Sequence, residues 1–217
     1  MGMRYTHILW DFNGTLLDDV RAGMESANLL LCAHGLSPLS SLDAYRAEFG
    51  FPIKDYYRRL GFDFEKTPYE VLAREWVPYY LACSRDSHLA ADAEETLRAC
   101  ATLGLSQTVL SASEQDMLER QIESLGIRPY LSEVLGLDNI HAHSKEGIGL
   151  EWRRRNPNAQ ALLVGDTLHD ATVARAIGAD CILLCCGHQS RARLLDAEPL
   201  FVADTLRDVA DWLRKTN

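Results

Sequence analysis

Short apolar runs alternate with amphipathic stretches along most of the 217-residue chain. The runs are too short for helices and predict buried strands, whereas the stretches between them repeat apolar residues at helical spacing. Strands that alternate with helices are typical of a parallel sheet covered on both faces, so the pattern predicts an α/β fold. The strands are predicted at His7–Phe12, Thr108–Leu110, Val134–Leu135, Ala161–Val164, Cys181–Cys185 and Phe201–Val202.

Residues that cap or stop helices mark the helical stretches of this alternating part. Ser144 is placed to cap a helix that Asn156-Pro157 stops, and Thr205 is placed to cap the last helix. A glycine follows two other stretches, as glycines commonly do at helix ends. These signals predict helices over 114–125, 144–155 and 168–177, with a further one after residue 205.

The segment 17–86 departs from this alternation, because it has helical periodicity and no convincing strand. Helices are predicted there over Val20–Ala33, Ser41–Phe49 and Tyr69–Ser84, with a Gly50-Phe51-Pro52 turn before the last of them. A long helical segment between the first and second strands indicates an insertion. We therefore predict a Rossmann-like core formed by residues 1–16 and 87–217, and an inserted helical cap formed by residues 17–86, hereafter the cap.

Composition narrows the choice of partners and compartment. With 47% hydrophobic residues the chain can form a substantial core, and a net charge of -9 argues against nucleic acid or an anionic membrane as partner. The six cysteines form no C-x-x-C pair, and the N-terminal residues lack the apolar core of a signal peptide. A reducing cytoplasm is therefore the expected location.

Polar side chains follow several of the predicted strands, at the edge where open parallel sheets bind ligands. Asp11 comes directly after Ile8-Leu9-Trp10 and precedes a turn at Gly14, whose backbone N–H groups can hold an anion. Ser111 follows the second strand and offers a hydroxyl to a phosphate oxygen. Lys145 precedes a predicted helix and adds a positive charge. The combination favours a site for a phosphorylated ligand.

A second group of carboxylates follows the strand over Ala161–Val164. Asp166 leaves that strand directly, and Asp170 lies four residues further on, one helical turn away. Both carboxylates can therefore face one point, and together with Asp11 they form a set of hard oxygen ligands. Oxygen ligands of this kind suit Mg²⁺, so the sequence predicts a magnesium site.

In this order, these segments resemble the four motifs of haloacid dehalogenase-type phosphohydrolases. Asp11-Phe12-Asn13-Gly14-Thr15 resembles motif I, Ser111 motif II, Lys145 motif III, and Asp166 with Asp170 motif IV. The helical insertion directly after motif I resembles the C1 cap of the phosphoglycolate phosphatase-like branch. The resemblance implies a Mg²⁺-dependent phosphatase that acts on a small phosphorylated metabolite through an aspartyl-phosphate.

The resemblance also implies a role for each matching residue. Asp11 would be the nucleophile, and Ser111 and Lys145 would stabilise charge on the transferred phosphoryl group. Mg²⁺ would be held by Asp11, Asp166, Asp170 and the backbone carbonyl of Asn13. The other residues expected to touch phosphate or substrate are Asn13 and Gly14 through their N–H groups, Ala112, and Gly50 and Phe51 of the cap turn.

Asn13 departs from motif I, where the family usually has a second aspartate that protonates the leaving alcohol and activates water. An amide cannot take up a proton at neutral pH. General acid–base catalysis contributes about 10²–10⁴-fold, so a deficit of that size is expected on alkyl phosphates, with acyl and aryl phosphates affected less. Asp18 and His169 are the candidates to replace the missing group.

Asn13 keeps alternatives open. A relative that binds a phosphorylated ligand, or transfers phosphoryl without efficient hydrolysis, would need no general base. Phosphonoacetaldehyde hydrolase relatives also lack the second aspartate and use a cap lysine for a Schiff base, a role that Lys54 could take. A metal-free haloacid dehalogenase is disfavoured by Asp166 and Asp170. Neither the substrate nor the oligomeric state is specified by the sequence.

Overall fold

The computed structural model describes residues 4–137 and 145–216, and its centre is a six-stranded parallel sheet. The strand order is β5-β4-β1-β6-β7-β8, and neighbouring strands all pair in parallel. The predicted α/β fold is therefore confirmed. The strands are β1 (His7–Trp10), β4 (Ser106–Glu114), β5 (Glu133–Leu137), β6 (Ala161–Gly165), β7 (Asp180–Leu184) and β8 (Phe201–Ala203).

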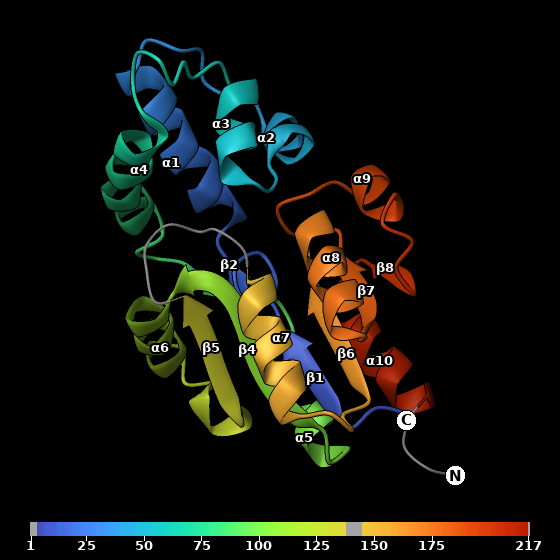
Figure 1. Ribbon diagram of the computed structural model, residues 1–217. Coiled ribbons are helices and arrows are strands. Elements are labelled where there is room, and N and C mark those ends of the chain that lie inside the picture. Colours follow the sequence, from blue (N-terminus) through green and yellow to red (C-terminus); the bar gives the residue numbers. More distant parts are fainter. Residues whose placement is uncertain (1–3, 138–144, 217) are drawn as a thin grey trace.

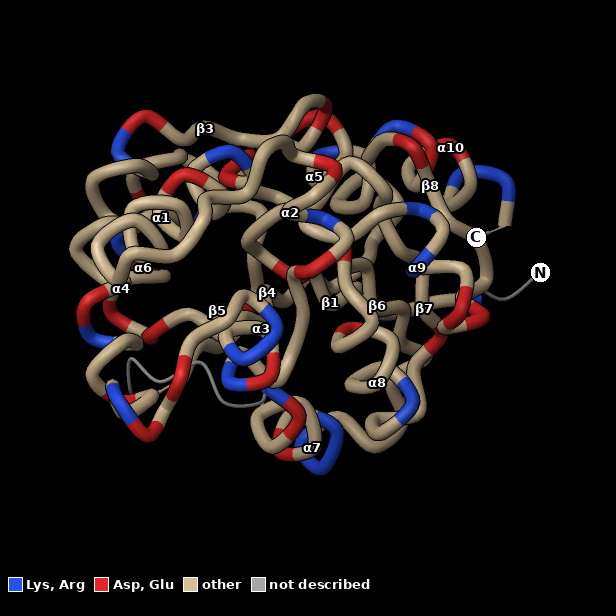
Figure 2. The backbone as a smooth tube through the Cα atoms, turned by 90° about the horizontal axis from the view of Figure 1, so that it is seen from above, with Lys and Arg blue, Asp and Glu red and all other residues tan. Residues whose placement is uncertain are grey.

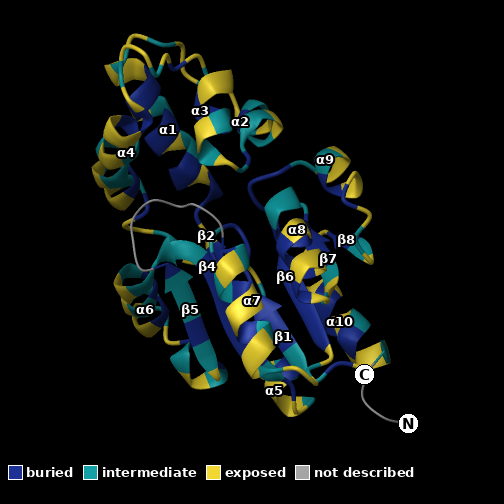
Figure 3. Ribbon diagram, in the orientation of Figure 1, coloured by how far each residue is buried: buried dark blue, intermediate teal, exposed yellow. Residues whose placement is uncertain are grey.

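Helices cover both faces of this sheet, as a parallel sheet with apolar residues on both sides requires. They include α5 (Ala93–Thr102), α6 (Gln115–Ser124), α7 (Glu146–Arg155), α8 (Leu168–Ile177) and α10 (Leu206–Thr216). Successive residues of β1 point to opposite faces. Leu9 packs on the side of α7 and α8, whereas Ile8 and Trp10 pack on the side of α5 and α10. The central strands β1 and β6 are largely buried, the edge strand β5 is partly buried, and the outer faces of the helices are exposed (Figure 3).

Four further helices lie beyond the carboxyl end of the sheet (Figure 1). They are α1 (Val20–Ala33), α2 (Leu42–Glu48), α3 (Ile53–Arg59) and α4 (Tyr69–Cys83). Their inner faces share an apolar core that includes Leu30, Tyr56 and Leu72. This core is distinct from the clusters that flank the sheet, which supports the cap as a separate unit. The division at residues 17 and 86 remains a proposal.

A short ribbon that was not predicted links the core to these helices. β2 (Leu17–Asp18) pairs antiparallel with β3 (His88–Leu89). The expectation of no strand within 17–86 is therefore wrong at its first two residues, because so short a strand carries no readable alternation. The ribbon is separate from the six-stranded sheet. It joins the two connecting segments at the point where the cap leaves the core.

Other differences from the predicted elements concern short helices and strand ends. β4 continues to Glu114, past the predicted end at Leu110. α3 and α9 (Arg191–Leu195) were not predicted, and the 5 residues of α9 span too few turns for a periodic pattern. α7 begins at Glu146, and Ser144, its predicted cap, lies outside the described residues.

Charged residues of both signs are spread around the periphery of the molecule (Figure 2). Many form exposed ion pairs, such as Arg98 with Glu94 at 2.7 Å. A mixed surface of this kind differs from the clustered basic face that attracts nucleic acid or anionic lipid. In the described part of the chain, no helix is both long and apolar enough to cross a bilayer.

Candidate active site

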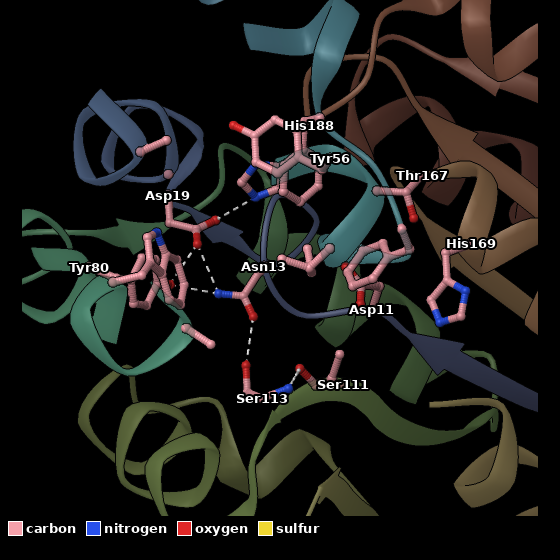
Figure 4. A pocket seen from close by; sticks show the side chains of 18 of the residues that line it. Asp11, Asn13, Asp19, Tyr56, Tyr80, Ser111, Ser113, Thr167, His169 and His188 are labelled. Carbon is pink, nitrogen blue, oxygen red and sulfur yellow. Dashed lines mark hydrogen bonds and ion pairs between the residues drawn. The ribbon is translucent and has the colours of Figure 1, made fainter. Parts of the chain in front are cut away.

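The ends of three adjacent strands and the starts of two helices bring the predicted motif residues to one cavity of about 360 Å³. β1 leads into Asp11, β4 contains Ser111, and β6 leads into Asp166. Lys145 precedes α7, and Asp170 lies in the first turn of α8. The cavity is also lined by cap residues, and Figure 4 shows part of it. The topology of the sheet thus gathers residues that are far apart in the sequence.

Lys145 is the positive centre of this cavity. Its side chain is buried, and its Nζ lies 2.5 Å from both Asp11 Oδ1 and Asp170 Oδ1. Nζ also donates to the carbonyl of Leu110 at 3.2 Å. Burial alone would lower the pKa of the Lys145 ammonium, but the two carboxylates outweigh burial and raise that pKa above its ordinary value. The ammonium therefore stays charged and can face a phosphate oxygen.

Asp11 is buried at the end of β1. One of its oxygens lies near Lys145, and the other accepts from Thr15 Oγ1 at 3.3 Å. Burial raises the pKa of Asp11 to about 6, although Lys145 acts in the opposite direction. The carboxyl is therefore ionised in most molecules at neutral pH. An ionised carboxylate that lines a cavity is chemically able to attack phosphorus.

Three carboxylates converge in the cavity. One oxygen each of Asp11, Asp166 and Asp170 lies within 4.8 Å of the others. Asp166 Oδ2 accepts from the N–H of His188 at 2.5 Å, whereas its Oδ1 is buried and has no hydrogen-bond partner among the described residues. Burial raises the pKa of Asp166 well above its ordinary value. Buried carboxylates this close repel one another unless a cation neutralises them, so the three oxygens fit a divalent ion such as Mg²⁺.

Two glycines allow the main chain to approach these carboxylates. A Cβ on Gly14 would lie 2.3 Å from Asp166 Oδ2, and one on Gly187 would lie 2.2 Å from the same oxygen. Gly14 also has a φ of +74°, which other residues adopt at a cost. Its N–H donates to the Leu17 carbonyl at 3.0 Å and to Asp19 Oδ1 at 2.8 Å. The N–H that was predicted to bind phosphate is therefore engaged within the protein.

Asp170 serves α8 and the cavity at the same time. Its Oδ2 accepts from the N–H and the hydroxyl of Thr167, at 2.9 and 2.7 Å, in a capping box that begins the helix. Its Oδ1 is the oxygen that pairs with Lys145. Burial would raise the pKa of Asp170, but Lys145 outweighs burial and holds that pKa below its ordinary value. One carboxylate therefore both completes the capping box of α8 and pairs with the cation of the cavity.

Ser111 lies within β4 rather than after it, which corrects the predicted strand end. The pairing with β5 shifts register between Leu110 and Glu114, so the strand is irregular where it passes the cavity. Ser111 Oγ accepts from the N–H of Ser113 at 3.0 Å. Ser111 and Ala112 both line the cavity. The Ser111 hydroxyl can still donate its proton to a phosphate oxygen.

Asn13 is fixed by three hydrogen bonds (Figure 4). Its Nδ2 donates to Asp19 Oδ2 and to the Tyr80 hydroxyl, both at 2.8 Å. Its Oδ1 accepts from Ser113 Oγ at 2.8 Å. The Tyr80 hydroxyl itself donates to Asp19 Oδ2 at 2.7 Å. Because the side-chain nitrogen faces a carboxylate, an amide rather than an ionised acid suits this position.

The carboxylate beside Asn13 is Asp19, and not its neighbour Asp18, which was predicted to replace the missing acid. Asp19 is buried and lines the cavity, whereas Asp18 is exposed on β2. His188 Nε2 lies 3.3 Å from Asp19 Oδ1. Burial would raise the pKa of Asp19, but His188 outweighs burial and lowers it. The carboxylate that is absent from position 13 thus has a counterpart in contact with that position.

His188 was also missed, although it follows β7 closely. Its Nδ1 lies 2.8 Å from the Tyr45 hydroxyl, so the ring bridges the cap and the core. Burial would lower the pKa of His188, but Asp19 outweighs burial and raises it to about 9. His188 lies four residues after the end of β7, and this position beyond a strand end is the signal in the sequence that could have selected it.

The cap turn contributes one of its two predicted residues to the cavity wall. The Phe51 ring lines the cavity, with its centroid 4.8 Å from that of His169. Gly50 is buried near the side chain of Arg193 and is not among the lining residues. His169 also lines the cavity, and burial lowers its pKa. A neutral His169 is therefore available as a proton acceptor near Asp170.

Lys54, the candidate Schiff-base lysine, lies away from the cavity wall. Its Nζ is 5.5 Å from the centre of the Phe64 ring and 5.8 Å from that of Tyr69. Lys54 is exposed, and within the described chain Lys145 is the only lysine that lines the cavity. A Schiff-base mechanism through the cap therefore has no support in this arrangement.

Two curated relatives are phosphoglycolate phosphatases. That of Vibrio vulnificus is 28% identical over 128 residues, which is 58% of this chain and 56% of that protein. That of Pseudomonas savastanoi pv. phaseolicola is 22% identical over 215 residues, which is 92% of this chain and 76% of that protein. The chain thus spans little more than half the length of the Vibrio relative.

Similarity of fold extends further than similarity of sequence. The structure of a haloacid dehalogenase-like family hydrolase from Streptococcus pneumoniae matches with a TM-score of 0.81 at 18% identity, over 96% of this chain and 98% of that chain. At that identity the likeness shows the fold alone. Residues 8–184 match the haloacid dehalogenase-like hydrolase family, a span that runs from β1 to β7. The chain therefore belongs to this family.

Proposed function

We propose that this chain is a Mg²⁺-dependent phosphatase that hydrolyses a small phosphate monoester through a phosphoryl group carried on Asp11. The observation that carries the proposal is the convergence of Asp11, Lys145 and the Asp166–Asp170 pair at one cavity. A binding module would not need a nucleophile, a fixed cation and metal ligands together. The phosphoglycolate phosphatases among its relatives support the same reaction class.

In the first step, an Asp11 oxygen attacks phosphorus while the bond from phosphorus to the leaving oxygen breaks. Lys145, whose charge is maintained by its two carboxylate partners, stabilises negative charge on the phosphoryl oxygens. The Ser111 hydroxyl donates to one of these oxygens. Mg²⁺ would be held by Asp11, Asp166, Asp170 and the backbone carbonyl of Asn13. The ion would offset the repulsion between the attacking carboxylate and the phosphate dianion.

In the second step, water attacks phosphorus, the bond to Asp11 breaks, and inorganic phosphate leaves. The attacking water must lose a proton, and the Asn13 amide cannot accept it. His169 is neutral by its lowered pKa and lines the cavity, so it is available for this role. The buried Asp19 contacts residue 13 but is already bonded to Asn13, Tyr80 and Gly14. The second step is therefore expected to be the slower one.

The bonding of Asn13 favours a second candidate function. An enzyme that accepts a phosphoryl group on Asp11 and releases it slowly would act as a phosphoryl carrier rather than an efficient hydrolase. The three hydrogen bonds that hold Asn13 as an amide are the observation in its favour. Burst kinetics separate the two: a carrier gives one rapid equivalent of leaving group per protein, followed by little turnover.

A screen of phosphate monoesters and acetyl phosphate, with Mg²⁺ and with excess chelator, tests the proposal. Release of inorganic phosphate that needs Mg²⁺, and that Asp11→Asn abolishes, is the expected result. If no compound is hydrolysed with Mg²⁺ present, the phosphatase proposal fails.

The chain's six cysteines are all unpaired. Because free thiols suit a reducing compartment, we also propose that the protein is located in the cytoplasm.

A further inference from the structure

The cavity has two chemically different sides. The core side carries Lys145 and the three carboxylates, whereas the cap side is formed mainly by aromatic and aliphatic side chains. The rings on the cap side include Phe49, Phe51 and Trp76. A phosphate bound at Asp11 would place the rest of its ester toward this apolar side. The side chains on the cap side therefore indicate which kind of leaving group the substrate carries.

Ring pairs connect the apolar side to the reacting groups. Trp76 stacks on Tyr80, with centroids 4.8 Å apart and planes 21° from parallel, and the Tyr80 hydroxyl bonds to Asn13. Phe51 packs on His169, at 4.8 Å and 30°. The Trp76–Tyr80 pair thus lies next to Asn13, which would contact the leaving oxygen. The Phe51–His169 pair lies beside Asp170. Aromatic faces in this position offer stacking to a flat ring.

Positive charge is scarce on the cap side. Among the described residues that line the cavity, the cationic side chains are Lys145, which is paired with two carboxylates, His188, which is paired with Asp19, and Arg120, which is exposed on α6. A leaving group that carries a carboxylate, as in phosphoglycolate, would bury that charge against rings. Burying an unpaired charge is strongly unfavourable. The wall therefore disfavours an anionic leaving group.

Asn13 supplies an independent argument for the same class of leaving group. An alcohol needs a proton to leave, and the Asn13 amide cannot supply one as an acid would. A phenolate leaves without one, because the ordinary pKa of a phenol is near 10. Asn13, which is expected to slow the hydrolysis of alkyl phosphates, is thus compatible with the hydrolysis of aryl phosphates.

We propose that the substrates are aryl phosphates, with the ring of the leaving group held on the aromatic wall that includes Phe51 and Trp76. This inference rests on the phosphatase activity proposed above. The P–O bond to the ring oxygen breaks, the phenolate departs into the cap side, and the phosphoryl group passes to Asp11.

A series of four monoesters tests the inference. Benzyl and cyclohexylmethyl phosphate share an alkyl leaving oxygen, so their ratio of kcat/KM reports the preference of the wall for an aromatic ring. Phenyl phosphate adds the better leaving group, and phosphoglycolate adds a charge. We expect benzyl to exceed cyclohexylmethyl phosphate by about three- to tenfold, and phenyl phosphate to exceed both. If phosphoglycolate is hydrolysed as well as phenyl phosphate, the inference is overturned.

Two variants separate ring recognition from folding. Phe51→Leu and Trp76→Leu retain apolar side chains, and each should lower the ratio of kcat/KM for benzyl phosphate to kcat/KM for cyclohexylmethyl phosphate about three- to tenfold. Leu29→Ala, an exposed position of α1 that does not line the cavity, is the control. Equal losses on both substrates would show a merely structural role and overturn the inference. No activity on any substrate, acetyl phosphate included, would instead reject the phosphatase proposal itself.

Discussion

Replacement of Asn13 by aspartate is the change whose outcome depends most closely on the structure. By sequence alone, Asn13→Asp restores the family residue and should speed hydrolysis of alkyl phosphates. In the structure, however, Asn13 Nδ2 lies 2.8 Å from Asp19 Oδ2. The substitution would place two carboxylate oxygens against each other, one on the buried Asp19 and one on the partly buried residue 13. We therefore expect Asn13→Asp alone to destabilise the protein.

The size of this effect follows from two contributions. A hydrogen bond to a charged partner is lost, which costs about 1.5–3 kcal/mol. Two unit charges about 4 Å apart repel by about 4 kcal/mol at an effective dielectric constant near 20. His188, 3.3 Å from Asp19, reduces the repulsion, and protonation of the new carboxyl limits it further. The expected loss of unfolding free energy is about 2–4 kcal/mol at about pH 8.

The pH dependence has a definite sign. Repulsion from Asp19 raises the folded-state pKa of the new carboxyl above its unfolded value of about 4. The folded state then binds more protons than the unfolded state between these two pKa values, so stability falls as pH rises through that window. At about pH 5 the new carboxyl is largely protonated and can donate to Asp19. The loss relative to wild type should then shrink to about 1 kcal/mol or less.

Urea denaturation at about pH 5 and about pH 8 measures the effect. The double variant Asn13→Asp with Asp19→Asn exchanges the two groups and should recover more than half of the loss. Asp18→Asn, at the exposed neighbour, is the matched control and should recover none. If Asn13→Asp is as stable as wild type at the higher pH, or if Asp18→Asn rescues it equally well, the account of the Asn13 contacts is wrong.

Activity should follow the same logic. The single variant holds its new carboxyl against Asp19, so its gain on an alkyl phosphate should be smaller than the full contribution of a general acid and base. The double variant frees that carboxyl from like-charge contact. Its rate should rise toward the limit of about 10²–10⁴-fold over wild type. A double variant no faster than the single one would mean that position 13 cannot act in proton transfer.

Three other predictions concern metal binding, chemical stability and motion. Asp166→Ala should raise the Mg²⁺ concentration needed for half-maximal activity more than Asp170→Ala. Asp170→Ala should also lower stability by about 0.5–2 kcal/mol, because it removes the hydrogen bonds by which Asp170 completes the capping box with Thr167. Equal activity of wild type with excess chelator would reject the metal site. Asn13 should deamidate more slowly in the native protein than in an unfolded peptide of the same sequence, because the N–H of the attacking Gly14 nitrogen is hydrogen-bonded to Asp19. Equal deamidation rates, measured by peptide mass spectrometry, would contradict this. Hydrogen exchange should be faster in the connecting segments 15–19 and 84–92 than in the sheet. Equal protection of the connecting segments and the sheet would argue against a cap that moves.

The sequence predicted those parts of the site that follow locally from strand ends. Asp11 and Asp166 each follow an apolar run, and parallel strands carry such residues to the same edge. Asp170 was predicted from its spacing to Asp166 on one helix face. These inferences need only local pattern and the geometry of regular elements, which is why they could be made without tertiary information.

Contacts between distant segments could not be predicted in the same way. Asp19 is held by contacts with Tyr80 in α4 and with His188 after β7, and no regular sequence spacing relates these three positions. α5 was missed although its sequence carries usual signals for a helix start, Asp92 at the N-cap and Glu94 and Glu95 in the first turn. The roles of neighbouring acids, such as Asp18 and Asp19, are decided by burial, which the sequence does not specify.

The central claim is that Asp11 carries the phosphoryl group. Its most direct test is mass spectrometry of protein quenched in acid during turnover of phenyl phosphate with Mg²⁺. We predict the mass of one phosphoryl group on the peptide that contains Asp11, and none on the same peptide of Asp11→Asn, which should also release no phosphate. A phosphoryl group on another residue, or phosphate release by Asp11→Asn at the wild-type rate, would contradict the account.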